Sequence, residues 1–264
     1  MGMSYAVVTA TLNAAETLPR ALRSVLGQSV APTQLVVVDG GSRDATESVA
    51  RREFDAARAA GARTDMRFLR QTGTGIAGAW NEAIDTLRAD IVLLVNADDW
   101  LEPGAASRVI DAFERHPDAG IVHGAARFHT SRGRVLGTVR SGWLGRAGIR
   151  CRTMHCSTAV RRAVYGELGG FDGSYRVALD VEFTERCHRA GVRFVELDEV
   201  LSNFTLGGVS NRSFARADLE MLRAGLEQSR SKLVPVASYL FRTLCMRPLR
   251  LAGFALRRGA TENA

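Results

Sequence analysis

The chain has 264 residues, enough for one large α/β domain or two small ones. Its hydrophobic content of 46% and charged content of 24% are ordinary for a soluble globular protein. No apolar run reaches the roughly 18 residues that a membrane span needs, which excludes a typical membrane-spanning protein. The net charge of +7 leaves nucleic acid and an anionic membrane surface open as partners.

Strand-like and helix-like segments alternate through the first 126 residues. Short apolar runs predict strands, and apolar residues at helical spacing predict the helices between them. This alternation predicts an α/β fold with a mostly parallel, twisted sheet flanked by helices on both faces. The predicted strands are 5–10, 35–39, 66–69, 91–95 and 121–126, and the predicted helices are 16–26, 44–58, 76–87 and 105–115.

The alternation weakens from residue 127 onward. Thr130–Arg134 is typical of a hairpin turn, and Gly142–Gly148 is typical of a loop. A second group of structured segments is predicted over Met154–Leu206, followed by helices from about Ser213.

The carboxyl-terminal segment, residues 212–264, is basic and predicted to be helical. Arg212–Arg258 contains 10 basic and 3 acidic residues, a balance that equals the net charge of the whole chain. Within residues 234–258, large apolar residues are interleaved with five arginines and interrupted at Pro248. Such a basic amphipathic pattern is typical of segments that lie in a membrane interface. A charged helix that packs on the domain is the alternative, and the sequence leaves both open.

The amino terminus and the cysteines indicate a reducing compartment. Met1–Tyr5 lacks a basic segment followed by an apolar one, so we expect no secretory signal. The four cysteines form no C-x-x-C pair, and reduced thiols in the cytoplasm are the simplest interpretation. Several Cys and His residues could collect around zinc, although their spacing matches no common zinc module. They are Cys151, His155, Cys156, Cys187 and His188.

The segment Ile91–Asp99 places two adjacent carboxylates directly after an apolar run. The run predicts a buried strand of a parallel sheet, and open α/β sheets bind ligands at the carboxyl ends of their strands. Asp98 and Asp99 repel each other, which is tolerable where a divalent cation lies between them and an anionic ligand. Carboxylate oxygens suit Mg²⁺ or Mn²⁺ bound together with substrate phosphates. A helix N-cap is the alternative.

Short polar residues also follow the first two predicted strands. Thr9, Thr11 and Asn13 could contact a nucleotide, although Asn13 could instead cap a helix. Asp39 could accept a hydrogen bond from a base N–H, or it could only form a turn. Gly40-Gly41 after it lets the backbone turn tightly or come close to a ligand.

Together these segments resemble family 2 glycosyltransferases of the GT-A fold, over about residues 4–211. The resemblance implies a Rossmann-like nucleotide-sugar half at about residues 1–126 and an acceptor half at about 127–211, with the carboxyl-terminal helices following. The segments that carry it are Thr9–Asn13, Val38–Thr46, Gly75–Ala83, Asn96–Asp99, Gly169–Asp172, Ala178–Phe183 and Leu206–Ser210.

The resemblance implies an inverting transfer of a sugar from a nucleotide-diphosphate sugar to the hydroxyl of a sugar or lipid-linked acceptor. The pathway implied is glycolipid or polysaccharide biosynthesis, in the cytoplasm or on the inner face of the cell membrane. Asn96–Asp99 looks like the D-x-D motif of the family, but its first position is Asn96, an amide that adds no charge to a metal. We therefore assign the Mn²⁺ or Mg²⁺ ion to Asp98, with Asp99 in support.

The other site residues are carried over by matching motif positions. Asp180 corresponds to the general base, with a helix N-cap as the alternative. His155 and Glu182 are assigned to the acceptor side, although His155 could be a structural histidine. The predicted nucleotide-sugar contacts are Thr9, Thr11, Asn13, Asp39, Gly41, Gly75, Asn81, Asn96, Ala97 and Asp98.

Two features of the sequence would also suit other classes of protein. Gly73, Gly75 and Gly78 form a literal G-x-G-x-x-G pattern, which would suit a Rossmann-type NAD(P)-dependent oxidoreductase. That pattern lies on the third strand–helix unit instead of the first, and it leaves Asp39 and residues 169–183 without a role. A nucleic-acid-binding protein would have to use the basic segment, but the chain contains no RNP, helix-turn-helix or finger pattern. We therefore expect no nucleic-acid partner.

Overall fold

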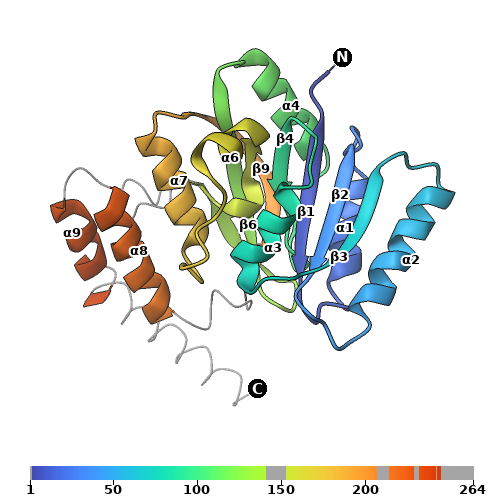
Figure 1. Cartoon of the computed structure of the whole chain (residues 1–264), viewed down its shortest axis with the longest axis horizontal. Coiled ribbons are helices and arrows are strands. Elements are labelled where there is room, and N and C mark those ends of the chain that lie inside the picture. The colour runs from blue at the N-terminus through green and yellow to red at the C-terminus, as the bar shows by residue number, and fades with distance from the viewer. Residues whose placement is uncertain (1, 141–152, 207–213, 229–231, 242, 245–264) are drawn as a thin grey trace.

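The structure is a computed structural model that describes residues 2–140, 153–206, 214–228, 232–241 and 243–244 (Figure 1). Within these residues, nine strands form one mixed sheet in the order β3-β2-β1-β4-β8-β6-β9-β5, with β7 paired to β6. Helices cover both faces of this sheet. The predicted α/β fold is therefore confirmed.

Four parallel strands form the amino-terminal part of the sheet. β1 (Tyr5–Thr11) lies between β2 (Gln34–Asp39) and β4 (Ile91–Leu94), and β3 (Asp65–Arg70) lies outside β2. Thr11 pairs with Asp39 and Val8 pairs with Leu94, so β1, β2 and β4 end at the same edge. The polar residues that follow these strands consequently meet there.

The remaining strands extend the sheet with mixed directions. β8 (Thr158–Arg161) is antiparallel to both β4 and β6 (Ala119–His129). β9 (Arg193–Thr205) is parallel to β6, and the two-residue β5 (Trp100–Leu101) is antiparallel to β9. β7 (Val135–Val139) forms a hairpin with β6. β6 crosses the predicted boundary at about residue 126, so the two predicted halves share one continuous sheet.

The two faces of the sheet are covered by different helices, which explains the unbroken apolar run of β4. Ile91 and Leu93 belong to a core with α1, α2 and α4, whereas Val92 and Leu94 belong to a core with α3, α6 and α7. A strand buried on both faces must be apolar at every position. These helices are α1 (Leu18–Leu26), α2 (Thr46–Ala59), α3 (Gly75–Ile84), α4 (Ala105–Arg115), α6 (Arg162–Leu168) and α7 (Leu179–Arg189).

Two carboxyl-terminal helices lie beside α7, on the side of the molecule away from β1–β3 (Figure 1). α8 (Phe214–Gln228) packs on α7, and α9 (Leu233–Phe241) packs on α8, where Pro235 lies against Gly225. Among the described helices, none has the length and apolar character to cross a bilayer. Some predictions lie outside the described residues, namely the Gly142–Gly148 loop, the 207–210 part of the last motif, Cys151 and the tail from Cys245.

Candidate active site

The loops after β1 and β2 are tied together by hydrogen bonds. The Asn13 N–H donates to Ser42 Oγ at 2.7 Å, and the Arg43 N–H donates to Asn13 Oδ1 at 2.8 Å. Asp39 is buried, and its carboxylate accepts from the N–H and the hydroxyl of Ser42. The N-cap position of α1 is Thr17, so the alternative interpretation of Asn13 as a helix cap is wrong. Both loops therefore form one preorganised surface at the carboxyl edge of the sheet.

The backbone is open at two of the predicted glycines. Gly41 and Gly75 have φ angles of +96° and +73°, and a Cβ at either would meet nothing within 4 Å. A side chain is therefore excluded by backbone conformation and not by crowding. Both glycines are exposed, Gly41 in the loop after β2 and Gly75 at the start of α3, where its carbonyl accepts from Gln71 Nε2 at 2.7 Å.

The glycine-rich segment before α3 does not offer the anion site that a dinucleotide would need. The carboxylate of Glu82 accepts from the N–H groups of Thr72 and Gly73, at 2.9 and 2.6 Å for the shorter contacts. A carboxylate thus already holds N–H groups that a pyrophosphate would use. The segment also follows β3, the outer strand, whereas the fingerprint belongs after a central strand.

The two carboxylates after β4 have different surroundings. Asp99 is only 1% exposed, and its Oδ1 accepts from the Thr205 N–H at 3.1 Å. Asp98 is partly buried, while its carbonyl oxygen accepts from the Thr205 hydroxyl at 2.7 Å. Burial, and then the charge of Asp99, raise the pKa of Asp98 to about 6. The helix-cap alternative for this doublet is wrong, because β5 follows it and α4 begins only after Gly104.

The described residues suit a metal ion that the substrate helps to hold. No three His, Cys, Asp or Glu side chains within the described part of the chain are grouped as a metal cage, which also leaves the zinc interpretation unsupported there. Asp99 is buried and its Oδ1 accepts from Thr205, so Asp98 is the more accessible carboxylate at the strand end. One carboxylate together with diphosphate oxygens and water is a common arrangement for Mg²⁺ and Mn²⁺. The residues therefore fit a cation that binds together with a diphosphate.

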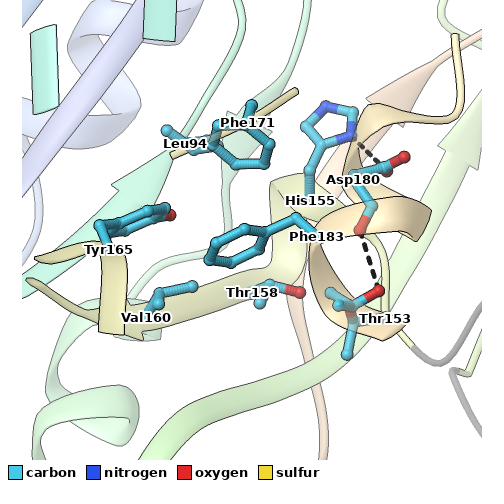
Figure 2. A pocket seen from close by; sticks show the side chains of 10 residues that line it. Leu94, Thr153, His155, Thr158, Val160, Tyr165, Phe171, Asp180 and Phe183 are labelled. Carbon is cyan, nitrogen blue, oxygen red and sulfur yellow. Dashed lines mark hydrogen bonds and ion pairs between the residues drawn. The ribbon is translucent and has the colours of Figure 1, made fainter. Parts of the chain in front are cut away.

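His155 connects the strand-end carboxylates to the predicted base. It lies in η1 (His155–Ser157), the short turn before β8. Its Nδ1 is 3.3 Å from Asp180 Oδ2 (Figure 2), and its Nε2 is 3.7 Å from Asp99 Oδ2. Burial by itself would lower the pKa of His155, but the hydrogen bonds and charges of Asp180 and Asp99 outweigh it and raise this pKa to about 10. The two carboxylates therefore favour the protonated, cationic form of the imidazole.

A protonated His155 would favour one orientation of the Asn96 amide. Asn96 Nδ2 lies 3.0 Å from His155 Nε2, and Asn96 Oδ1 is buried with no partner among the described residues. An imidazolium nitrogen can only donate, so exchanging the amide nitrogen and oxygen gives Oδ1 a donor. In that orientation His155 donates to both motifs. An amide at position 96 also avoids adding a further carboxylate beside Asp98 and Asp99.

A pocket with a mostly apolar lining lies beside Asp180. Figure 2 shows Asp180 and His155 at one side of this pocket. Asp180 is the second residue of α7, whose N-cap position is Ala178, so the N-cap alternative for Asp180 is wrong. Its side chain is 18% exposed and can therefore be reached from outside the fold. The apolar lining residues are Leu94, Val160, Tyr165, Phe171 and Phe183.

Two predicted site residues instead hold the loop between α6 and α7. Asn81 donates to the Phe171 carbonyl and accepts from the Phe171 N–H, both at 2.8 Å. Glu182 is buried and pairs with Arg186 at 2.8 Å, and Arg186 donates to the carbonyl of Gly170 at 2.7 Å. The structure thus places Asn81 and Glu182 as supports of the loop between α6 and α7. No contact with a donor is needed to explain either residue.

Two supporting residues were missed by the sequence analysis. Arg20 donates to the Asp98 carbonyl at 3.2 Å, and its guanidinium carbon lies 3.6 Å from the Trp100 ring centroid. Thr205 bonds to both carboxylate residues of the doublet. Arg20 is an ordinary helix arginine in the sequence, with no motif to mark it. Thr205 stands immediately before the Leu206–Ser210 motif, which was the only available signal.

Comparison with known proteins finds a matching family model and a similar glycosyltransferase. Residues 6–165 match the sequence model of glycosyl transferase family 2. A PGL/p-HBAD biosynthesis glycosyltransferase of Mycobacterium bovis is 30% identical over 186 residues, which are 69% of each chain. Asp180 lies beyond the residues that match the family model.

The fold has close neighbours among solved structures. Mannosyltransferase PcManGT from Pyrobaculum calidifontis, in complex with GDP-Man and Mn²⁺, is 18% identical with a TM-score of 0.72. That match covers 99% of this chain and 76% of PcManGT. S. aureus TarS 1–349 in complex with UDP-GlcNAc is 17% identical with a TM-score of 0.68. That match covers 91% of this chain and 74% of the TarS chain. The chain spans only 44% of the longer TarS structure. None of these comparisons supports the oxidoreductase alternative.

Proposed function

The chain belongs to glycosyl transferase family 2, and on that premise we propose that it transfers a sugar, with inversion, from a nucleoside diphosphate sugar to an acceptor hydroxyl. The observation that carries this proposal is the position of His155. Its ring contacts Asp180 on one side and the Asn96–Asp99 motif on the other. The base and the diphosphate motif, which come from separate parts of the sequence, thus belong to one connected site.

On the donor side, Asp98 would hold a Mn²⁺ or Mg²⁺ ion together with the diphosphate. When bound, such a cation stabilises the negative charge that grows on the leaving diphosphate. Asp99, Thr205 and Arg20 would keep the Asp98 backbone in place. The nucleotide would lie along the edge formed by Thr9, Thr11, Asp39 and the open backbone at Gly41.

On the acceptor side, Asp180 would remove the proton of the attacking hydroxyl. General bases of this kind must lie within hydrogen-bond reach of the hydroxyl and on the face opposite the leaving group. The imidazolium of His155 would keep one carboxylate oxygen of Asp180 fixed by a charge-assisted hydrogen bond. The other oxygen accepts from the Val181 N–H at 2.9 Å. Attack from this face inverts the anomeric centre.

The donor assignment can be tested by ligand-induced thermal stabilisation, because a ligand that binds only the folded state raises its melting temperature. The panel consists of UDP, GDP and TDP, each with Mn²⁺ or with EDTA, and of NAD⁺. The names of the neighbours include UDP-GlcNAc and GDP-Man, so either base would agree with the proposal. We expect one nucleoside diphosphate to stabilise the protein with Mn²⁺ and Asp98→Ala to lose this effect. Stabilisation by NAD⁺ alone, or a full shift in Asp98→Ala, would contradict the proposal.

We further propose that the acceptor is lipid-linked and that α9 rests on the inner face of the cell membrane. Four large apolar side chains of this region are exposed, and three of them belong to α9 at spacings of three and four residues, which place them on one side of that helix. The same part of the sequence carries the excess of arginines, and each basic residue near an anionic leaflet is worth about 1 kcal/mol. The exposed residues are Leu233, Val236, Leu240 and Leu244.

Vesicle flotation tests this membrane proposal. The protein should float with phosphatidylglycerol vesicles at low salt and stay behind with neutral vesicles. Leu233→Ser combined with Leu240→Ser should abolish flotation, whereas Leu136→Ser, at an exposed apolar position of β7, should not. Full-length protein that ignores anionic vesicles would refute membrane binding. A truncation before Val234 that fails to fold would instead show that this segment serves the core.

A further inference from the structure

The segment that leads into the helix carrying Asp180 is held by a residue of another helix. The N-cap residue of α7 is Ala178, which has no polar side chain. The carboxylate of Glu220, in α8, accepts from three successive N–H groups just before α7. Its Oε2 lies 3.1 Å from the Arg176 nitrogen, 2.8 Å from that of Val177 and 3.0 Å from that of Ala178. Hydrogen bonds from several N–H groups to one ionised acceptor are among the stronger ones in proteins.

A second group of contacts attaches α8 to the same segment. The Tyr175 hydroxyl donates to Glu227 Oε2 at 2.7 Å, and Arg223 pairs with Glu227 at 2.7 Å. The Arg223 guanidinium also lies 4.6 Å from the centroid of the Tyr175 ring. On the α7 side, Met221 packs against Ala178 and Val181. α8 therefore holds both the loop before α7 and its first turn.

We propose that Glu220 is a positioning residue for Asp180, and that α8 is consequently part of the catalytic apparatus. Ala178 is only two residues before Asp180, so fixing its N–H fixes the start of the helix that presents the carboxylate. Asp180 can contact His155 at 3.3 Å only while that first turn stays in place. This inference rests on the proposed role of Asp180 as the general base. It extends the active site into a helix that lies beyond the matched residues 6–165.

Nuclear magnetic resonance of the His155 imidazole reports whether Asp180 is within hydrogen-bond distance of its Nδ1. Long-range ¹H–¹⁵N spectra report the hydrogen bonds of each ring nitrogen, and the chain has five histidines, so His155 can be assigned with a His155→Gln variant. We expect Glu220→Ala to move the Nδ1 resonance toward its position in Asp180→Asn. Glu220→Gln keeps one acceptor oxygen and should move it less. Arg216→Ala, at an exposed position of the same helix, is the control and should leave it unchanged.

Turnover provides the functional readout, measured as nucleoside diphosphate release from UDP-N-acetylglucosamine or GDP-mannose with Mn²⁺. Glu220→Ala should reduce kcat on the order of tenfold to a hundredfold and leave KM for the donor unchanged, because a small misplacement of a reacting group slows catalysis by such factors. In an Asp180→Asn background, Glu220→Ala should cause no further loss. If Glu220 only stabilised the fold, its replacement would lower kcat by the same factor in the wild-type and Asp180→Asn backgrounds.

The positioning role of Glu220 and the role of Asp180 as general base can fail independently. If Glu220→Ala and Glu220→Gln leave the His155 resonances at their wild-type positions, the positioning role of Glu220 is overturned, even where Asp180→Asn is inactive. If Asp180→Asn turns over at the wild-type rate, the proposed general base is wrong. In that case the spectra still show whether Glu220 fixes the start of α7.

Discussion

Replacing Asp98 with Asn should stabilise the ligand-free protein, because folding buries this carboxylate beside the charge of Asp99. Burial and the charge of Asp99 raise the pKa of Asp98 from 3.8 to about 6. A shift of about two units corresponds to about 3 kcal/mol between the two protonation states, and partial solvent access reduces this to about 2 kcal/mol. For a protein of this size, the melting temperature should rise by about 4–8 °C.

The pH dependence of this effect has a definite sign. A carboxyl group whose pKa is raised by folding binds its proton more tightly in the native state, so ionisation destabilises the fold. This penalty is absent below the unfolded pKa near 3.8 and complete above about 6. The advantage of Asp98→Asn should therefore be full at pH 7.5, and about two-thirds of it should be gone at pH 4.5.

The assay is thermal unfolding in EDTA at these two pH values, with wild type, Asp98→Asn and an Asp111→Asn control at an exposed position of α4. The control should differ from wild type by no more than about 0.5 kcal/mol. With Mn²⁺ and a nucleoside diphosphate, wild type should melt at a higher temperature than Asp98→Asn, since only the carboxylate can bind the cation. An Asp98→Asn protein that is no more stable than wild type at pH 7.5, or equally more stable at both pH values, would refute the reasoning.

Two further substitutions test the acceptor side. Asp180→Asn should reduce nucleoside diphosphate release about a hundredfold or more, while the nucleotide-induced thermal shift stays normal; near wild-type turnover would remove Asp180 from the mechanism. Gly170→Ala would place a Cβ 2.3 Å from Asn81 Oδ1, so we expect a loss of about 1–3 kcal/mol in urea unfolding. Gly173→Ala, where a Cβ meets nothing within 4 Å, is its control. An equal loss of unfolding free energy in both variants would contradict the crowding at Gly170.

The parallel part of the sheet could be predicted because its signals are local. β1, β2 and β4 are short apolar runs, and the motif residues stand directly after them. The structure confirms that these ends meet at one edge. β5 was missed because two residues carry no periodicity. The outer part of β9 was hard to recognise because it is only partly buried, so its residues do not form an apolar run.

The connections within the candidate site could not be predicted, because they join residues far apart in the sequence. His155 and Asp180 are 25 residues apart, and Asn96 and His155 are 59 apart. The Glu220 carboxylate that accepts from the Ala178 N–H lies 42 residues further along the chain. Local rules for helix caps examine only the neighbouring residues, and Ala178 gives no signal there. The sequence could name Asp180 as a candidate without showing what holds it.

The pairing of β5 with β9 has a consequence for how the protein is made. Trp100 pairs with Asn203, and the Thr205 N–H donates to Asp99, so the motif after β4 depends on a strand about a hundred residues further along. Because a chain is made from its amino terminus, β1–β4 are synthesised before β6, β8 and β9, which complete the sheet. The motif after β4 can acquire its contact with Thr205 only once β9 has been made.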